Sequence, residues 1–255
     1  MTGAAIQANG RHGSITLPWR SMLMGVVAVL AYLVPGAAPE ALVFDRVAIA
    51  QGEWWRLLTG HWVHSDPAHA GWDITALLLL GALFEPRLQW RLPLALLIGT
   101  VGVNAWLWWM EPALRDYCGL SGILNSLLIV GLLQLWRDCR DPLVLLTGVA
   151  AAAKILLELS LGQTLLTRTT WPAVPAVHAA GFLSGLVCVA GWRMLASAGV
   201  TPASSRRSAF RRHCLPMARS LFSDYQDNTR LNNRHPPWTD CIACDHPRSL
   251  HRSHE

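Results

Sequence analysis

Residues 119–136 read GLSGILNSLLIVGLLQLW. The stretch contains no charged side chain and exceeds the lower limit of about 17 residues for a helix that crosses hydrocarbon. Lipid forces backbone polar groups to pair within the chain, so we expect this segment to be a membrane-spanning helix. Ser121 stands at its beginning, and a polar residue in such a place is a candidate for function.

Five further apolar segments have a similar length. In chain order, with the first one included, they are residues 19–35, 67–84, 92–110, 119–136, 142–159 and 173–195. We therefore predict an all-α membrane protein with a core of six transmembrane helices over residues 19–196. The first segment also has the outline of a signal peptide, since Arg11 and Arg20 precede its short apolar stretch. Pro39 would hinder cleavage after Gly36-Ala37-Ala38, which favours a retained helix.

The composition agrees with this class. Hydrophobic residues make up 52% of the chain and charged residues 15%, against about 25% charged in a soluble domain, which argues against an ordinary soluble enzyme. The formal net charge is +5, but residues 193–255 alone hold ten arginines and five acids. The rest holds 21 − 10 = 11 basic and 16 − 5 = 11 acidic groups. We predict a basic, disordered cytoplasmic tail over residues 197–255 and no nucleic-acid partner.

The arginines of the loops predict the orientation. With the N-terminus inside, the inner segments carry Arg11, Arg20, Arg87, Arg91, Arg137 and Arg140 besides the tail, and the outer ones carry Arg46, Arg56, Arg115 and Arg168. The excess predicts that both termini are inside, with residues 1–18 as a cytoplasmic segment. In the long loop 36–66, the stretch EWWRLL (residues 53–58) predicts an interfacial segment rather than a span, and Asp66-Pro67 predicts a helix start.

This topology places polar residues of three helices at one depth. His69 and Asp73 lie near the outer end of the second helix, and Ser121 opens the fourth. His178 lies about five residues into the sixth helix, or about 8 Å along its axis. The coincidence depends on the fifth segment, residues 142–159, being a span; otherwise His178 would lie on the opposite side.

The three clusters suit nucleophilic hydrolysis. A serine hydroxyl needs a base within hydrogen-bond reach, and His178 can be that base for Ser121. The free N–H groups and positive dipole end at the start of a helix can stabilise an oxyanion. Glycines would give the turn before the serine its freedom and let two helices pack closely: Gly119, Gly122, Gly181 and Gly185. Alternatively, Gly-Leu-Ser-Gly is only a packing turn and His178 a hydrogen-bonded packing residue.

Two clusters invite a metal interpretation. The first contains His61, His64, His69 and Asp73. A metal-type intramembrane protease should show a His-Glu-x-x-His helix, and the chain has none. In the tail, Cys241 and Cys244 form one pair without a partner pair, which is weak support for zinc beside the alternative of a disordered tail. We predict no metal and no cofactor.

Further motifs stand before, within and just after the second predicted helix. They are Trp55-Arg56 followed by Thr59, then His64, His69-x-x-x-Asp73, and Glu85 after that helix. With Gly119-Leu120-Ser121-Gly122 and His178-x-x-Gly181-x-x-x-Gly185, the sequence resembles the rhomboid family of intramembrane serine proteases. The resemblance runs over about residues 20–195, with order and spacing in place.

The resemblance implies a rhomboid-like six-helix bundle that cleaves membrane-anchored protein substrates in the bilayer near its outer face. It implies a Ser–His dyad without a third acid, in which Ser121 attacks and His178 moves the proton. His69, residue 73 and the Ser121 N–H would stabilise the oxyanion. The family usually has Asn where this chain has Asp73, and an ionised Asp cannot donate a hydrogen bond. Asp73 is then protonated, orients His69, or weakens the oxyanion hole.

Within the family, the sequence is most similar to the rhombosortase branch. The fifth helix carries Lys154-x-x-x-Glu158 followed by Gly162, and Val174-Pro175 precedes His178 by the branch's spacing. An i,i+4 ion pair is the alternative explanation of Lys154 and Glu158. The branch implies a bacterial inner-membrane location and substrates with a C-terminal Gly-Gly motif, a membrane helix and a basic tail.

Two other functions stay open from the sequence. A catalytically inactive relative would bind transmembrane helices, although Ser121 and His178 are both present. A small transporter would need polar residues through the full depth of several helices, whereas here they cluster at the outer end, with Lys154 and Glu158 as the main exception. The sequence makes no prediction of the oligomeric state.

Overall fold

The computed structural model describes residues 17–165, 169–172 and 174–198, which form helices and one small antiparallel strand pair. The elements are α1 Trp19–Leu33, β1 Phe44–Asp45, α2 Arg46–Ala50, α3 Arg56–Thr59, α4 Pro67–Leu88, α5 Arg91–Met110, β2 Asp116–Tyr117, α6 Ser121–Cys139, α7 Pro142–Leu161 and α8 Ala176–Ser197. The predicted all-α class is confirmed in its coarser form, since the described residues are mostly helical. The predicted segments 1–18 and 197–255 lie almost wholly outside the described residues.

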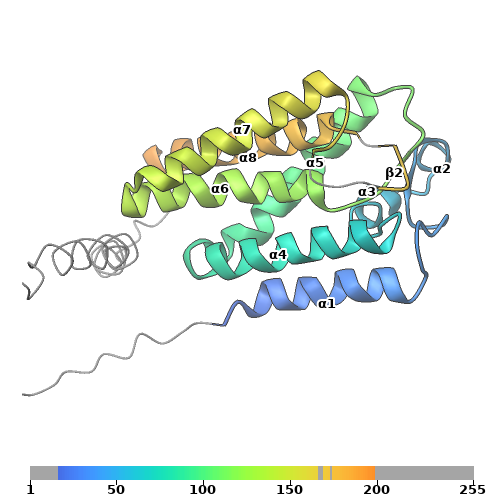
Figure 1. Cartoon of the computed structure of the whole chain (residues 1–255), viewed down its shortest axis with the longest axis horizontal. Coiled ribbons are helices and arrows are strands. Elements are labelled where there is room, and N and C mark those ends of the chain that lie inside the picture. Colours follow the sequence, from blue (N-terminus) through green and yellow to red (C-terminus); the bar gives the residue numbers. More distant parts are fainter. Residues whose placement is uncertain (1–16, 166–168, 173, 199–255) are drawn as a thin grey trace, which may run out of the picture. The chain divides into compact units, whose positions relative to one another are not determined.

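Helix α6 forms the centre of the bundle. It packs against α8, α5, α4 and α7, while α1 packs on α4 (Figure 1). Its buried residues occur along most of its length, whereas only Ile155 and Glu158 of α7 are buried. The stretch that begins at Ser121 is therefore the core helix, and α7 lies at the edge of the bundle.

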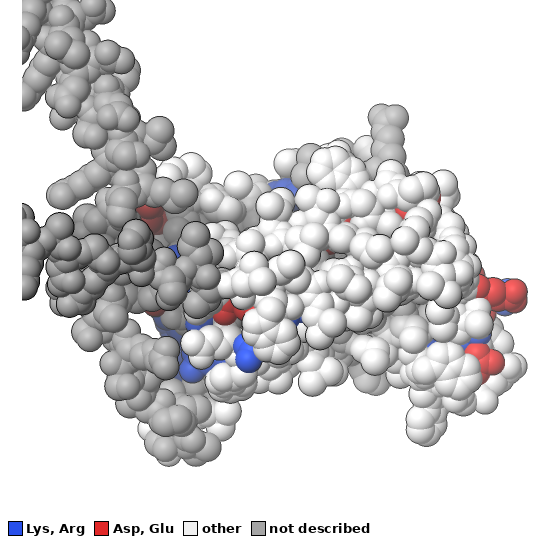
Figure 2. Space-filling view, turned by 90° about the horizontal axis from the view of Figure 1, so that it is seen from below, with Lys and Arg blue, Asp and Glu red and all other residues white. Residues whose placement is uncertain are grey.

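In the described part of the chain, four helices are long and apolar enough to cross a membrane, namely α4, α5, α7 and α8. Helix α1 is shorter, and α6 carries polar side chains such as Asn125, Ser126 and Gln134 along its apolar sequence. On the face seen in Figure 2, few charged side chains interrupt the middle of the helices. A multi-pass membrane protein is thus supported, while the count of six spans and the orientation stay predictions.

The starts of α4, α6 and α8 lie at the same end of the bundle (Figure 1). The predicted start of α4 is confirmed, because the Asp66 side chain accepts a hydrogen bond from the backbone N–H of His69 at 2.8 Å and Pro67 is the first helical residue. The fifth predicted segment is helix α7, which returns the chain so that α8 starts beside α6.

The connection between α1 and α4 folds against the start of α6. Its EWWRLL stretch forms only the one-turn helix α3, so the prediction that this stretch is not a span is confirmed. Phe44 of β1 pairs with Tyr117 of β2. The N–H of Gly119 donates to the carbonyl oxygen of Gly60 at 3.0 Å. These contacts hold the segment that leads into Ser121.

Glycines lie at the contact between α6 and α8. A methyl group at Gly181 would overlap the carbonyl oxygen of Gly122. A methyl group at Gly185 would lie 2.7 Å from the carbonyl oxygen of Ser126. Larger residues would force the two helices apart, and with them the side chains at their starts.

At the end of the bundle away from the starts of α4, α6 and α8, a buried carboxylate joins α4 to α1. Glu85, 5% exposed near the end of α4, accepts hydrogen bonds from the Ser21 hydroxyl at 2.7 Å and from the backbone N–H groups of Ser21 and Arg20 at 2.8 and 3.0 Å. The first N–H groups of a helix have no partner within it, so this carboxylate caps α1.

Candidate active site

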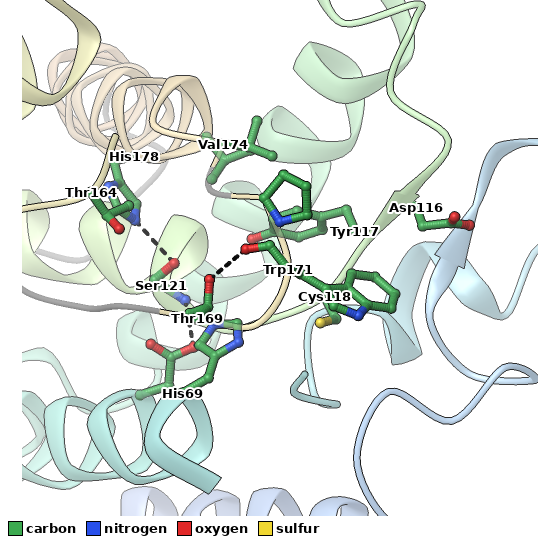
Figure 3. A pocket seen from close by; sticks show the side chains of 13 residues that line it. His69, Asp116, Tyr117, Cys118, Ser121, Thr164, Thr169, Trp171, Val174 and His178 are labelled. Carbon is green, nitrogen blue, oxygen red and sulfur yellow. Dashed lines mark hydrogen bonds and ion pairs between the residues drawn. The ribbon is translucent and has the colours of Figure 1, made fainter. Parts of the chain in front are cut away.

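Ser121 and His178 lie in hydrogen-bond contact. The Ser121 Oγ is 3.0 Å from Nε2 of His178, and Ser121 is the first residue of α6 (Figure 3). His178 lies near the start of α8 and is 5% exposed. The two residues are 57 positions apart in the chain, so the packing of α6 on α8 creates the pair.

His69 and Asp73 lie beside this pair. They are one turn apart on α4, and both line the cavity that contains Ser121 and His178. The Asp73 Oδ2 atom accepts hydrogen bonds from the backbone N–H groups of Leu120 and Ser121 at 2.7 and 3.1 Å. The predicted site residues are therefore brought together, from three helices.

The Asp73 oxygen occupies a crowded polar position. Besides the two N–H groups, Nε2 of His64 and Nε2 of His69 lie 3.3 and 3.5 Å from Oδ2. The Ser121 N–H, which we expected to bind a substrate oxygen, is engaged by Asp73 instead. A substrate oxyanion at this position would lie against the Asp73 carboxylate. The position usually filled by Asn in the family therefore carries an acceptor where a donor is expected.

A carboxylate also stands behind the histidine. Oε2 of Glu158, on α7, lies 2.8 Å from Nδ1 of His178, and Glu158 is fully buried. The resemblance implies a dyad without a third acid, whereas the structure places a carboxylate oxygen at Nδ1 of His178. The sequence does contain this glutamate, in the pattern Lys154-x-x-x-Glu158. An ion pair within α7 is sufficient to explain that pattern, and the structure has this ion pair at 2.7 Å.

Gly119 is required by its backbone and by its surroundings. Its φ is +119°, in the region that favours glycine, and a methyl group there would lie 2.5 Å from Nε2 of His69. The turn before Ser121 can therefore approach His69 only with glycine at this position.

The cavity beside Ser121 is lined in part by described residues between α7 and α8. Its lining includes Thr164, Thr169, Trp171, Pro172 and Val174 of this connection and Asp116, Tyr117 and Cys118 before α6 (Figure 3). Burial raises the pKa of the Cys118 thiol to about 12, so the thiol stays protonated and does not compete with Ser121 as a nucleophile.

Asp66 ties this connection to α4. Its Oδ2 accepts a hydrogen bond from the Thr170 N–H at 3.0 Å, while Oδ1 caps the helix at His69. Partial burial raises the pKa of Asp66, but the hydrogen bonds from Thr170, His69 and Ser65 outweigh it and lower the pKa to about 2. Asp66 is thus ionised at neutral pH.

The histidine cluster does not form a metal site in the described part of the chain, where no three acidic, His or Cys side chains are placed to hold an ion. His61 packs edge-on against Tyr117, with ring centroids 5.6 Å apart. Burial lowers the pKa of His61 to about 4, so it is neutral at pH 7. The Cys241 and Cys244 pair lies outside the described residues.

Membrane-length helices, with a serine and a histidine in contact at one end of the bundle, define a polytopic membrane protein with a candidate serine hydrolase site. The family model described as Rhomboid domain matches residues 51–195, which is more than half of the chain. The chain therefore belongs to the rhomboid family, which is a family of intramembrane proteases. A search of curated proteins finds no match.

Proposed function

We propose that the protein is an intramembrane serine endopeptidase that cleaves membrane-anchored proteins near the outer face of the bilayer. The observation that carries the proposal is the 3.0 Å contact between Ser121 Oγ and His178 Nε2. Membership of the rhomboid family supports the reaction class. The proposal includes the six-span arrangement with both termini inside, in a bacterial inner membrane, because this places the starts of α4, α6 and α8 at the outer face.

The reaction starts at the serine. His178 Nε2 takes the hydroxyl proton while Ser121 Oγ bonds to the scissile carbonyl carbon. Collapse of the tetrahedral intermediate breaks the C–N bond, and the imidazolium returns the proton to the leaving amine. Water then attacks the acyl-enzyme, with His178 again accepting the proton; the C–O bond to Ser121 breaks as the imidazolium returns that proton to Oγ.

His69, Asp73 and the Ser121 N–H are the proposed oxyanion groups. Asp73 already accepts the Ser121 N–H, at 3.1 Å. For the substrate oxygen to bind there, the Asp73 carboxylate must turn aside or take up a proton, because an ionised carboxylate only accepts hydrogen bonds. His69 Nε2 is 3.5 Å from the same carboxylate oxygen and faces the same position.

The decisive experiment is labelling of the purified full-length protein with a fluorophosphonate probe. We expect labelling of the wild type and none in Ser121→Ala or His178→Ala. The matched control is Ser184→Ala on α8, whose hydroxyl donates to the carbonyl of Ala180 in its own helix. Labelling that survives Ser121→Ala would refute the proposal, as would a wild type that neither reacts nor cleaves.

The substrate class follows from the similarity to the rhombosortase branch. We propose surface proteins with a C-terminal Gly-Gly motif before a membrane helix and a basic tail. Glycine weakens a helix, which lets the substrate backbone extend toward Ser121. Cleavage of such a helix in proteoliposomes, compared with a variant whose Gly-Gly is Leu-Leu, tests this part; equal cleavage of both would contradict it.

A further inference from the structure

Glu158 makes three hydrogen bonds that divide between its two oxygens. Oε1 accepts from Nζ of Lys154 at 2.7 Å and from the backbone N–H of Leu165 at 2.9 Å. Oε2 lies 2.8 Å from Nδ1 of His178 and has no other partner among the described residues. An ion pair with Lys154 therefore uses only one oxygen, and the other is left for the histidine.

The place of Glu158 in the fold is unusual for a carboxylate. Helix α7 lies at the edge of the bundle, and Ile155 and Glu158 are its only buried residues. Removing a carboxylate from water is costly unless its charge is compensated by partners. Lys154, 32% exposed, supplies a compensating charge one turn away, so the carboxylate can remain ionised where it meets His178.

We propose that Glu158 is a positioning residue that completes a Ser121–His178–Glu158 arrangement for the proposed proteolysis. Nδ1–H of His178 donates to Oε2 of Glu158, which leaves the Nε2 lone pair directed at the Ser121 hydroxyl. When Nε2 takes the serine proton, the carboxylate stabilises the imidazolium. Glu158 itself stays unprotonated, and Lys154 and the Leu165 N–H hold it in place. The inference rests on the proposed function.

Other titratable groups share the cavity with His178, among them Asp116, Tyr117 and Cys118 before α6. Glu158 faces the histidine from α7 and Ser121 from α6, while His69 and Asp73 of α4 line the same cavity. Neither residue of α4 has a hydrogen bond to His178 in the described chain. A change at position 158 should therefore act directly on the histidine.

The test compares wild type, Glu158→Gln and Glu158→Asp as full-length proteins in proteoliposomes. Glu158→Gln keeps the shape but removes the charge, and we expect kcat/KM and the rate of fluorophosphonate labelling to fall at least about 100-fold. The acidic limb of the kcat/KM profile should move to lower pH, because the imidazolium loses its counter-charge. A purely structural role would not move this limb.

Glu85→Gln is the matched control, because it removes the same charge from another buried helix position. It should leave the pH profile in place. If Glu158→Gln fails to fold, Glu158→Asp keeps the charge but withdraws it from Nδ1, and we expect at least a tenfold loss in a folded protein. A folded Gln or Asp variant with wild-type rates and pH profile would overturn the inference. An inert wild type would instead refute the proposed function.

Discussion

The two ends of the bundle each contain a buried glutamate that accepts three hydrogen bonds. At one end, Glu85 of α4 binds the Ser21 hydroxyl and the backbone N–H groups of Ser21 and Arg20. At the other end, Glu158 of α7 binds Lys154, the Leu165 N–H and His178. Glu85 and Glu158 are therefore alike in the number of hydrogen bonds that they accept and nearly alike in burial.

The two glutamates differ in the chemistry of their partners. The donors on Glu85 belong to a helix start and never lose their protons, so the contact can only hold α1 to α4. One partner of Glu158 is a histidine, whose ring can take up and release a proton and which itself contacts Ser121. A buried carboxylate therefore indicates a reactive site only when its partner can accept a proton and reaches a nucleophile.

The largest effect should come from breaking the reactive end at His178. We expect His178→Ala to lower kcat by up to about 10⁶-fold, as in serine proteases whose base is removed. If Glu158 acts only through His178, then Glu158→Gln added to His178→Ala should cause no further loss. Rates of the four proteins in this double-mutant cycle measure the coupling; additive losses would contradict it.

The next largest effect concerns the end of the bundle that contains Glu85. Glu85→Ala leaves the Ser21 hydroxyl and N–H without their acceptor, which should cost about 2–4 kcal/mol of stability. In a thermal-shift measurement this corresponds to a fall in Tm of roughly 5–15 °C. The kcat/KM of the folded fraction should match wild type. A changed pH profile of kcat/KM in this variant would contradict the claim that Glu85, unlike Glu158, acts only on the structure.

A third carboxylate, Asp73, sharpens the comparison because it lies at the reactive end without touching His178 through a hydrogen bond. Asp73→Asn replaces a carboxylate that must first turn aside or take up a proton with an amide that donates a hydrogen bond directly. We expect kcat/KM to rise, by roughly tenfold, which is about 1.4 kcal/mol of transition-state stabilisation. A large loss of activity would instead assign the acid a role of its own.

The smallest effect should come from Asp66, which ties the connection after α7 to α4. Asp66→Asn keeps a good helix cap but removes the charge that binds Thr170. We expect Tm at pH 7 to fall by about 2–4 °C. The pKa of Asp66 is about 2 in the fold and 3.8 ordinarily, so its stabilisation is present above pH 4 and is lost as pH falls toward 2.

Tm values of wild type and variant should therefore converge as the pH falls from 4 toward 2. Asp141→Asn is the control, because it makes the same change at another helix cap. Asp141 caps α7 by accepting the Leu143 N–H at 2.9 Å. A gap between wild type and Asp66→Asn that stays constant from pH 7 to the lowest pH would contradict the assignment.

Much of the site could be predicted because its motifs are local. Apolar length predicted the helices, and counting them predicted that His69, Asp73, Ser121 and His178 meet at one end. The spacing of Gly181 and Gly185 predicted the close packing of α8 on α6. What the sequence did not predict is the contact between Glu158 and His178, because a partner one turn away, Lys154, already accounted for the charge.

The sequence by itself determined the class of the protein, the helices and the residue types at one end of the bundle, since hydrophobic length and spacing within a helix are local properties. Only the tertiary structure decided which atoms meet: Oε2 of Glu158 with His178, and Oδ2 of Asp73 with the Ser121 N–H. The physical reason is that the rotation of each helix about its own axis is set by packing against its neighbours. That rotation decides which side chains of a helix face a neighbouring helix.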